Sequence, residues 1–439
     1  MSAPLSAITE RSTRRPVRIV HIGFGRFFRA HQAWYTARAG DAADWGIAAF
    51  TVRSPTIAAD LGEHQGIYPL IVRGPEADTI ETIDSVVAVL PGSDVNALCD
   101  YVSRPEVAVI TLTVTEAGYG IGASGAADMD EVDVRDDLAA LKAGAGTARS
   151  VLGRVTLALS ARRDSGAGPI AVVSCDNIPG NGRFLSRGVL SFAALLDEQL
   201  CEWIRAHVSF VSTSVDRITP QVAGEQVVTE PFSDWVLSGD FPAGRPDWGS
   251  AGARFVDDIE PWEHRKLWLL NGAHSILAFH GQLRGHETVA EAVADPECRA
   301  LVDAFWREAV QCLPPGIEHV QYRRDLIARF TNPRIVHSLA QIAGEATTKV
   351  AYRLAAVAER SVASGREGDA GATAIAAWIR WVCGGHSAPD SRQAEVDAAL
   401  LATDPIRELV ALVSPFLAAS DTFVDRLRDR AQTARRASP

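Results

Sequence analysis

Lysine is scarce in this sequence. Only Lys142, Lys266 and Lys349 occur among the 43 basic residues, and arginine supplies the rest. Arginine stays protonated at any workable pH, whereas a lysine that is removed from water can lose its proton near neutrality and act as a general base. In a chain that otherwise uses arginine, Lys266 and Lys349 are therefore candidate functional residues, and the alternative is that both are chance surface lysines.

Long apolar runs are also lacking. No stretch reaches the roughly 18 to 20 apolar residues needed to span a bilayer, and the first 16 residues lack the apolar centre of a secretory signal. With 439 residues, 47% of them hydrophobic and 22% charged, the chain is long enough for two packed domains. We therefore expect a globular cytoplasmic protein with no membrane partner.

The sequence also lacks paired cysteine spacings and an excess of positive charge, which excludes several classes of function. The cysteines at positions 99, 175, 201, 298, 312 and 383 have neither the spacing of a disulfide framework nor that of a zinc cluster. Positive charge is outweighed, because the net charge is −11 and the pI is near 5.5, which argues against a nucleic-acid partner. We expect reduced cysteines, no metal site and a small-molecule substrate.

The first half of the chain has the pattern of an α/β domain. Apolar runs that end in polar residues, as buried parallel strands do, span 17–22, 45–52, 107–115 and 169–177. Apolar residues at helical spacing occur in 93–104 and 148–166. These patterns predict a Rossmann-type, doubly wound domain with a mostly parallel sheet over residues 1–260. Its last part, 221–260, is rich in Pro, Gly, Asp and Trp, and we interpret it as an irregular boundary.

The second half has almost entirely helical patterns, beginning with "EHRKLWLLNGAHSILAFHGQL" at 263–283. We therefore predict a mostly α-helical substrate and catalytic domain over residues 261–439.

A glycine turn follows the first predicted strand. Gly23 and Gly25 fit the first two glycines of a GxGxxG dinucleotide motif, but Phe28 occupies the third position. Such a turn lets main-chain N–H groups approach a pyrophosphate, although an ordinary strand-to-helix turn remains the alternative. Arg53 stands near the end of the second strand, where an acidic residue would hold the ribose hydroxyl of NAD. The expected cofactor is NAD, with NADP left open.

Polar residues also follow two later predicted strands. Thr115 and Glu116 end one strand, and Asp176 and Asn177 end another. Open α/β sheets bind ligands at the carboxyl ends of their strands, so these residues are candidates for cofactor or substrate contacts. As single residues they are equally well explained as helix caps or turn residues.

Three polar residues stand among apolar ones in "KLWLLNGAH". On a continuous α-helix, at about 100° per residue, Lys266, Asn271 and His274 lie near 0°, 140° and 80°, on one face. Lysine can accept a proton, and asparagine can hold a developing alkoxide through its amide N–H groups. A surface lysine, a helix-interior asparagine and a core histidine are the structural alternative.

Several segments occur together and in order over residues 17–415. They include "IVHIGFGRFFRAHQAWY", "LTVTEAGY", "SCDNIPGNG", "VDRITP", "FVDDIEPWEHRKLWLLNGAHS" and "RFTNPRIVHSLAQIAGEATTK". Together they resemble the polyol-specific long-chain dehydrogenases of the mannitol dehydrogenase family. The resemblance implies a Rossmann-type domain followed by a helical domain. It also implies metal-independent hydride transfer between NAD(H) and a secondary alcohol or ketone of a polyol or sugar acid.

The resemblance also implies roles for single residues. Lys266 matches the family's general base, and Asn177 and Asn271 match two asparagines that hold the reacting oxygen. His274 matches a histidine that orients the substrate, and Glu263 a glutamate that relays the proton to solvent. The remaining matches, to substrate-binding positions, are Val215, Asp216 and Lys349.

Two positions favour a sugar acid as substrate. Enzymes for mannitol and arabinitol carry arginine where this chain has Gln341, and the fructuronate reductases of the family resemble it at His337 and Gln341. This points to D-mannonate and D-fructuronate, with mannitol or arabinitol oxidation as the alternative. "GEATTK" departs from the usual "DGS" or "EGS" at Ala346 and Thr347, which we expect to remove a flexible point and to change the pocket wall.

Two other classes of function remain open. A lysine in an apolar site can form a Schiff base, as in an aldolase or decarboxylase, but the glycine turn would then be unexplained. A dinucleotide-binding regulator without turnover would keep the fold. We expect a monomer or a small homo-oligomer.

Overall fold

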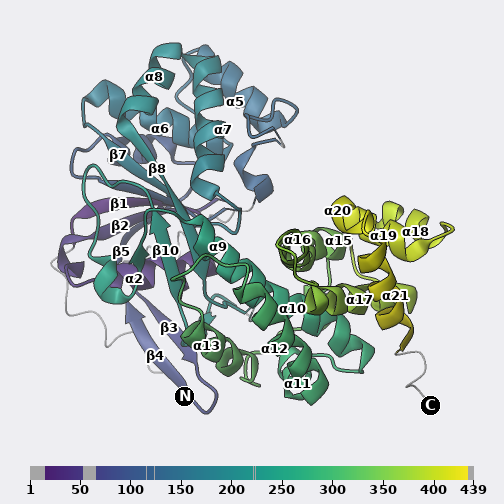
Figure 1. Ribbon diagram of the computed structural model, residues 1–439. Helices are drawn as coiled ribbons and strands as arrows, with labels where there is room; N and C mark the ends of the chain where they lie inside the picture. The colour runs from purple at the N-terminus through teal and green to yellow at the C-terminus, as the bar shows by residue number, and fades with distance from the viewer. Residues whose placement is uncertain are drawn as a thin grey trace. The chain divides into compact units, whose positions relative to one another are not determined.

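A computed structural model of the chain describes residues 15–52, 66–114, 116–122, 124–220, 222 and 224–433. Contacts divide the chain into two compact units (Figure 1). Unit 1 consists of Met1–Arg73 and Ala77–Ile259, and unit 2 of Gly74–Glu76 and Glu260–Pro439. Among the described residues, no helix is long and apolar enough to cross a membrane.

Unit 1 is built on an eight-stranded sheet in the order β11-β10-β8-β7-β6-β1-β2-β5. Its strands are β1 Val17–Ile22, β2 Gly46–Phe50, β5 Val86–Leu90, β6 Val109–Leu112, β7 Ile170–Ser174, β8 Val208–Asp216, β10 Asp234–Ser238 and β11 Arg254–Phe255. The first six in chain order are parallel, and β10 runs antiparallel to β8. The strand order reverses between β1 and β6, and ligands of open α/β sheets bind at such a switch point.

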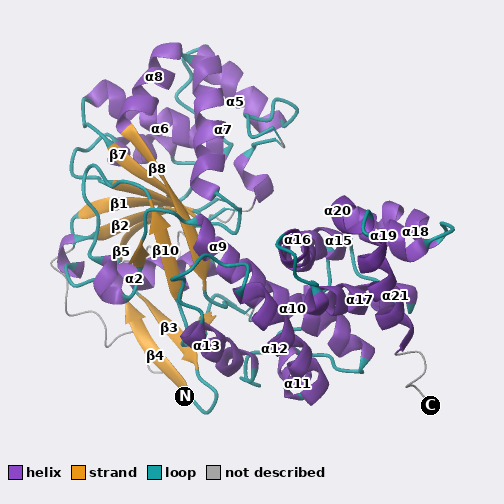
Figure 2. Ribbon diagram, viewed as in Figure 1, coloured by secondary structure: helices purple, strands orange, loops and turns teal. Residues whose placement is uncertain are grey.

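Helices cover both faces of this sheet (Figure 2), which confirms the doubly wound prediction. Because side chains alternate along a strand, Ile19 faces a core formed with the first helices, whereas Val20 faces a core formed with the later ones. The first helices are α1 Arg26–Ala30 and α2 Gln32–Arg38. The later helices are α4 Val95–Val102, α5 Val132–Lys142, α6 Val151–Ser165, α7 Asn181–Leu196 and α8 Glu198–His207.

The interpretation of residues 221–260 as irregular was wrong, although the segment does end at the boundary between the two units, after Ile259. This segment contains β10 and β11 of the large sheet and β9 Val227–Thr229, which joins β3 Tyr68–Arg73 and β4 Asp78–Ile83 in a second, three-stranded sheet. Trp235 and Trp248 are fully buried, and their ring centroids are 4.6 Å apart. The many glycines and prolines separate strands of two to five residues, which are too short for a clear alternating pattern.

Unit 2 is helical, as predicted. Its first long helix begins with α9 Glu260–Arg265 and continues through η5 Lys266–Asn271, α10 Gly272–Ile276 and η6 Leu277–Gly281. Two of these four segments, η5 and η6, are π-helical, with i→i+5 rather than i→i+4 hydrogen bonding. The assumption of a regular α-helix over 263–283 was therefore wrong.

A second long helix runs through α15 Ala346–Val350, η7 Ala351–Ala355 and α16 Ala356–Ala363, and η7 is also π-helical. Segment η5 packs against η7, and α10 packs against α12, α14 and α15. The other helices of unit 2 are α11 Val289–Ala294, α12 Pro296–Val310, α13 Val320–Phe330, α14 Leu339–Ile342, α17 Asp369–Cys383, α18 Gln393–Leu400, α19 Pro405–Val413, α20 Pro415–Ala418 and α21 Asp421–Thr433.

Candidate active site

The glycine turn follows β1 at the switch point of the sheet. Gly23 has φ +113°, and a Cβ atom built on it would lie 2.0 Å from the carbonyl oxygen of Thr113, so only glycine fits. Gly25 precedes α1, and a Cβ atom there would meet nothing nearer than the Gly23 carbonyl oxygen at 3.8 Å. The conformation requires the first glycine, whereas the second leaves the main chain open to a ligand.

Phe28 fills the space that the third glycine of the motif would leave open. Its ring is fully buried and stacks on His21 with the centroids 3.5 Å apart. His21 contacts the Thr111 hydroxyl at 2.8 Å and the Gly23 carbonyl at 3.0 Å, and burial lowers its pKa to about 3. A neutral histidine thus supports the turn, and only the main chain of Phe28 is left to contact a cofactor.

The other predicted cofactor residues receive little structural support. Arg53 and Thr115 lie outside the described residues, and Glu116 begins η3 Glu116–Tyr119 without a described side chain. These three positions therefore stay predictions, and the glycine turn is the part of the expected cofactor site whose geometry can be described.

The half-buried Asp176, after β7, and the buried Tyr119, in the η3 segment after β6, form a hydrogen-bonded pair. The Tyr119 hydroxyl donates a short hydrogen bond to Asp176 and also contacts the Ser174 hydroxyl at 2.9 Å. Burial is the main reason that the pKa of Asp176 rises to about 7, although the bond from Tyr119 opposes the rise. Asp176 is therefore partly protonated at neutral pH.

Replacing Asp176 by asparagine is expected to flatten the pH dependence of stability. The native carboxyl group keeps its proton up to about pH 7, whereas the unfolded one loses it near pH 4. The free energy of unfolding of the parent therefore falls as the pH rises from about 4 to 7, by on the order of 4 kcal/mol. Asparagine still accepts the bond from Tyr119 without titrating. Urea unfolding of both proteins at pH 5 and 7.5 measures this difference. An equal change in unfolding free energy between the two pH values in both proteins would refute the prediction.

Asn177 follows Asp176 and is exposed. The loop that carries Asn177 is held in place by Asn181, a residue that the sequence did not single out. The buried Asn181 donates from Nδ2 to the carbonyl oxygens of Asp176 and Thr213, both at 2.9 Å. Its Oδ1 accepts the N–H of Thr213 at 2.8 Å. In the sequence "CDNIPGN" nothing distinguishes the structural Asn181 from the predicted site residue Asn177, since both are asparagines of the same turn.

Val215 and Asp216, two predicted substrate residues, are buried at the end of β8. The neighbouring Arg217 is buried as well and donates to the carbonyl oxygens of Ala30, at 2.5 Å, and Glu230, at 3.2 Å. This arginine ties the end of β8 to the first helix, and so fixes the position of Asp216.

The π-helical turn changes the geometry of the predicted lysine–asparagine–histidine stripe. Lys266 and Asn271 are half-buried and are the first and last residues of η5. With i→i+5 hydrogen bonding, residues five apart come to lie nearly one above the other, rather than about 140° apart as in an α-helix. Glu263 is half-buried one turn before Lys266. The structure thus places Lys266 and Asn271 on the same face, more closely than the α-helical prediction did.

A cluster of basic side chains lies next to this stripe. The ring of the buried His274 is 4.9 Å from that of His337 and 4.8 Å from that of Phe330, between centroids. Burial lowers the pKa of His337, and the charges of Arg329 and Lys349 lower it further. The pKa of Lys349 is also lowered, by burial and then by the charge of Arg353. The predicted residues His274, His337 and Lys349 are therefore brought together within unit 2.

Gln341 precedes Lys349 of this cluster in the chain, and the segment "GEATTK", which differs from the usual family sequence, ends at that lysine. Gln341 is exposed at α14. Ala346 is buried and begins α15, and the buried Thr347 hydroxyl donates to Asp390 at 2.9 Å. The positive φ of 51° belongs to Glu345, so Ala346 occupies no position that requires glycine. The threonine hydroxyl is satisfied by Asp390 instead of being presented at an exposed surface.

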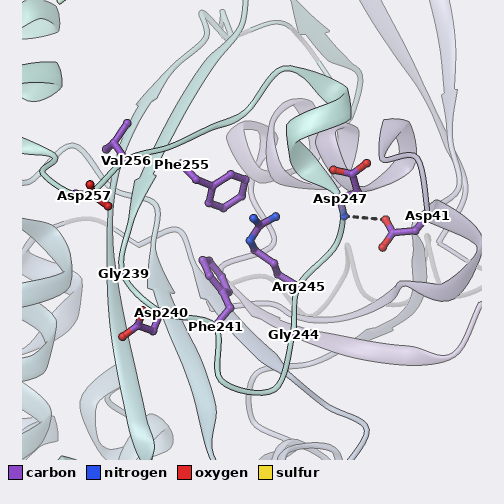
Figure 3. Close-up of a pocket in the computed structure, with 10 residues that line it drawn as sticks. All are labelled: Asp41, Gly239, Asp240, Phe241, Gly244, Arg245, Asp247, Phe255, Val256 and Asp257. Atoms are coloured by element: carbon purple, nitrogen blue, oxygen red, sulfur yellow. Dashed lines mark hydrogen bonds between the residues drawn. The ribbon is translucent and has the colours of Figure 1, made fainter.

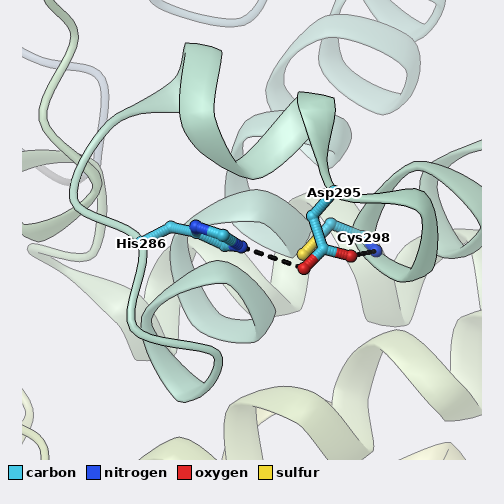
Figure 4. A group of neighbouring side chains, drawn as sticks. All are labelled: His286, Asp295 and Cys298. Atoms are coloured by element: carbon cyan, nitrogen blue, oxygen red, sulfur yellow. Dashed lines mark hydrogen bonds and ion pairs between the residues drawn. The ribbon is translucent and has the colours of Figure 1, made fainter.

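One group of side chains has the composition of a metal site. His286, Asp295 and Cys298 offer ligand atoms within 4.8 Å of one another (Figure 4). Asp295 already accepts from His286 at 2.9 Å, from Arg284 at 2.6 Å and from the main-chain N–H groups that begin α12. Burial raises the pKa of the Cys298 thiol to about 12, which disfavours the thiolate that a metal binds. This group is best explained as a helix cap.

Unit 1 has a hollow of about 590 Å³ beside β10 and β11 (Figure 3). Arg245 lies between its two aromatic rings, with the guanidinium carbon 3.4 Å from the centroid of Phe255 and 5.6 Å from that of Phe241. None of the predicted site residues lines it. The hollow is separate from the strand ends at which the cofactor is expected.

Comparison with known proteins assigns both halves of the chain. The family model of the mannitol dehydrogenase Rossmann domain matches residues 17–250, and that of the mannitol dehydrogenase C-terminal domain matches residues 258–434. D-Mannonate oxidoreductase of Escherichia coli is 34% identical over 85% of this chain and 81% of its own length. Mannitol 2-dehydrogenase of Cereibacter sphaeroides is 35% identical over 74% of this chain and 72% of its own.

A solved structure extends the similarity to three dimensions. Mannitol 2-dehydrogenase of Pseudomonas fluorescens, in a ternary complex with NAD and D-mannitol, is 30% identical and has a TM-score of 0.78. The match covers 99% of this chain and 93% of the other. The two matched domains, the relatives and the fold together show that the chain belongs to the mannitol dehydrogenase family of oxidoreductases.

Proposed function

We propose that the protein is an NAD(H)-dependent oxidoreductase that interconverts D-mannonate and D-fructuronate, with Lys266 as the general base. The observation that carries this proposal is the arrangement in unit 2, where Lys266 and Asn271 share a face of the π-helical turn next to His274, His337 and Lys349. Identity to relatives does not discriminate between substrates, because it is 34% for the mannonate enzyme and 35% for a mannitol enzyme. The sugar acid is favoured by His337 and Gln341.

Each predicted residue has a role in this proposal. In alcohol oxidation Lys266 accepts the hydroxyl proton, and Glu263 passes it to solvent. Asn177 and Asn271 donate to the reacting oxygen as it gains negative charge. His274 orients the substrate, and the remaining contacts to its hydroxyl and carboxylate groups are assigned to Val215, Asp216, His337, Gln341 and Lys349. No metal is required in this scheme, because the lysine itself supplies the base.

We assign dinucleotide binding to residues 1–260 and catalysis to residues 261–439. The turn at Gly23 and Gly25 fits a pyrophosphate, since it leads directly into α1 and Gly25 places no side chain at the start of that helix. NAD, when bound, supplies the hydride acceptor. The alternative cofactor, NADP, is tested together with the substrate.

Replacing Gly25 by alanine is expected to weaken NADH binding about tenfold while the fold stays intact. The new methyl group meets no protein atom within 3.8 Å, so any loss reflects the approach of the ligand. Gly146→Ala is the matched control, since a Cβ atom there meets nothing within 4 Å and the site lies far along the chain from the turn. Fluorescence titration with NADH and melting curves measure both effects. Unchanged affinity in the Gly25 variant would argue against cofactor binding at this turn.

The proposed substrate is tested by initial rates with D-mannonate, D-altronate, D-mannitol and D-arabinitol, each with NAD and NADP. We expect the highest kcat/KM with D-mannonate and NAD. A preference for D-mannitol or D-arabinitol would support the alternative, a polyol 2-dehydrogenase. NADH binding without turnover of any member would instead support a silent regulator.

A further inference from the structure

Arg353 is a basic residue that the proposed mechanism does not use. It lies in η7, four residues after Lys349 on the same continuous helix. Its Nη1 donates to the carbonyl oxygen of Asn271 at 3.4 Å and to the Ser275 hydroxyl at 3.2 Å. Both bonds are long and both acceptors are neutral. Burial lowers the pKa of this guanidinium to about 10, which still leaves it charged at neutral pH.

Within the part of the chain that the structure describes, Arg353 forms no ion pair with a carboxylate and is less well supplied with acceptors than other arginines. Arg162 is held by main-chain carbonyls on all sides, and Arg265 lies between two aromatic rings next to Glu318. Arg353 has five N–H groups and uses one nitrogen for two weak bonds. Its Nε and Nη2 atoms have no acceptor among the described residues and are not enclosed by protein, so their requirement for an acceptor can be met by an anionic ligand.

The neighbours of Arg353 make this requirement stronger. The Lys349 Nζ atom donates to the carbonyl oxygen of Ile342 at 3.0 Å, again a neutral acceptor. Residues four apart lie on one face of a helix, so the ammonium and the guanidinium are close enough for each to affect the other's charge. His337 is held neutral by burial and by the charges of Arg329 and Lys349, and Glu345 and Asp390 offset part of the charge of Lys349. A carboxylate would neutralise part of the remaining positive charge, whereas the hydroxyl groups of a polyol would not.

We infer that Arg353 binds the carboxylate of a sugar-acid substrate and thereby makes the enzyme prefer an aldonate to the polyol of the same carbon skeleton. The planar guanidinium can bind both carboxylate oxygens at once, and Lys349 provides a second charge beside it. Its bond to the main-chain carbonyl oxygen of Asn271 ties this carboxylate subsite to the turn that carries a residue proposed to hold the reacting oxygen. The inference rests on the proposed function, which it refines to a substrate class and to the residue that selects it.

The test compares matched substrate pairs in the parent and in Arg353→Gln and Arg353→Lys. The pairs are D-mannonate with D-mannitol and D-gluconate with D-sorbitol, which differ only in a carboxylate or a hydroxymethyl group. We expect the glutamine variant to lower the ratio of kcat/KM for aldonate over polyol by about 10- to 100-fold, mainly through KM. The lysine variant should recover part of the ratio because it keeps the charge. Arg307→Gln, which removes an exposed arginine of α12, is the control for a general loss of positive charge.

The outcomes separate this inference from the proposed function. An equal loss for both members of each pair would show that Arg353 only supports Asn271 and Ser275, and would overturn the inference while D-mannonate stays the substrate. Selective loss with D-gluconate, but no activity with D-mannonate, would support the inference and refute the proposed substrate. If the parent oxidises polyols only, and calorimetry of its NADH complex detects no binding of either aldonate, both fail.

Discussion

Replacing Lys266 by alanine is expected to lower kcat for alcohol oxidation by about 10²- to 10⁴-fold and to leave NADH affinity unchanged. The lysine acts on the substrate hydroxyl and not on the cofactor, and it belongs to unit 2 whereas the glycine turn belongs to unit 1. Because it is half-buried at the start of η5, its removal leaves little unfilled space. Stopped-flow or steady-state rates, together with NADH titration, measure both effects.

The arginine variant distinguishes base catalysis from simple charge. Lys266→Arg keeps the positive charge but cannot give up its proton, so its rate should fall almost as far as that of the alanine variant. In the parent, oxidation should become faster as the pH rises, because the free amine is the active form. Lys142→Ala is the matched control, since Lys142 is exposed at the end of α5 and should be silent. An active arginine variant, or a rate independent of pH, would remove Lys266 from the role of base.

Replacing Arg162 by methionine is expected to destabilise unit 1 by about 3–5 kcal/mol and to lower its melting midpoint by about 10 °C. The side chain is fully buried in α6, and its guanidinium donates only to main-chain carbonyl oxygens. These acceptors are Val102, Arg104, Val107, Ala167, Gly168 and Pro169, at distances of 2.7 to 3.3 Å. Methionine fills a similar volume but removes the donor that these carbonyl oxygens share, and of the six the Arg104 oxygen still accepts from the Val107 N–H.

The neighbouring residue provides the control for this prediction. Arg163 is more exposed and forms ion pairs with Asp164 and Asp197 at the surface of the same helix. Surface ion pairs contribute little, so Arg163→Met should cost less than about 1 kcal/mol. Differential scanning calorimetry of both variants gives the comparison. If both melt like the parent, the carbonyl network around Arg162 is not a source of stability.

Long periodic segments allowed much of the fold to be predicted. The strand predicted at 17–22 is β1 Val17–Ile22, and the predicted strands at 45–52, 107–115 and 169–177 contain β2, β6 and β7. Each is a short, largely apolar run in the middle of a parallel sheet that is covered on both faces, which is a clear pattern for a strand. The strands between 221 and 260 were missed because each is short and their burial comes from partners such as β8, far away in the sequence.

The candidate site was predictable by residue type but not by local geometry. Lys266 stood out because lysine is rare in this chain, and His274 because it is polar in an apolar run. The supporting residues His21 and Asn181 carry no such signal, because their function depends on hydrogen bonds to segments that meet only in the folded chain. Arg353 is one of many arginines, and it becomes conspicuous only once its lack of an ion pair within the described part of the chain is known.

The wide turn at η5 makes the number of residues between Lys266 and Asn271 as important as their identity. Loss of a single residue between Lys266 and Asn271 would allow an ordinary α-helix to form in place of the π-helical turn. The asparagine would then lie four residues after the lysine on an α-helix, about 40° away and still on the same face. The wide turn and the five-residue spacing therefore match each other, and a change of one without the other would separate the two side chains.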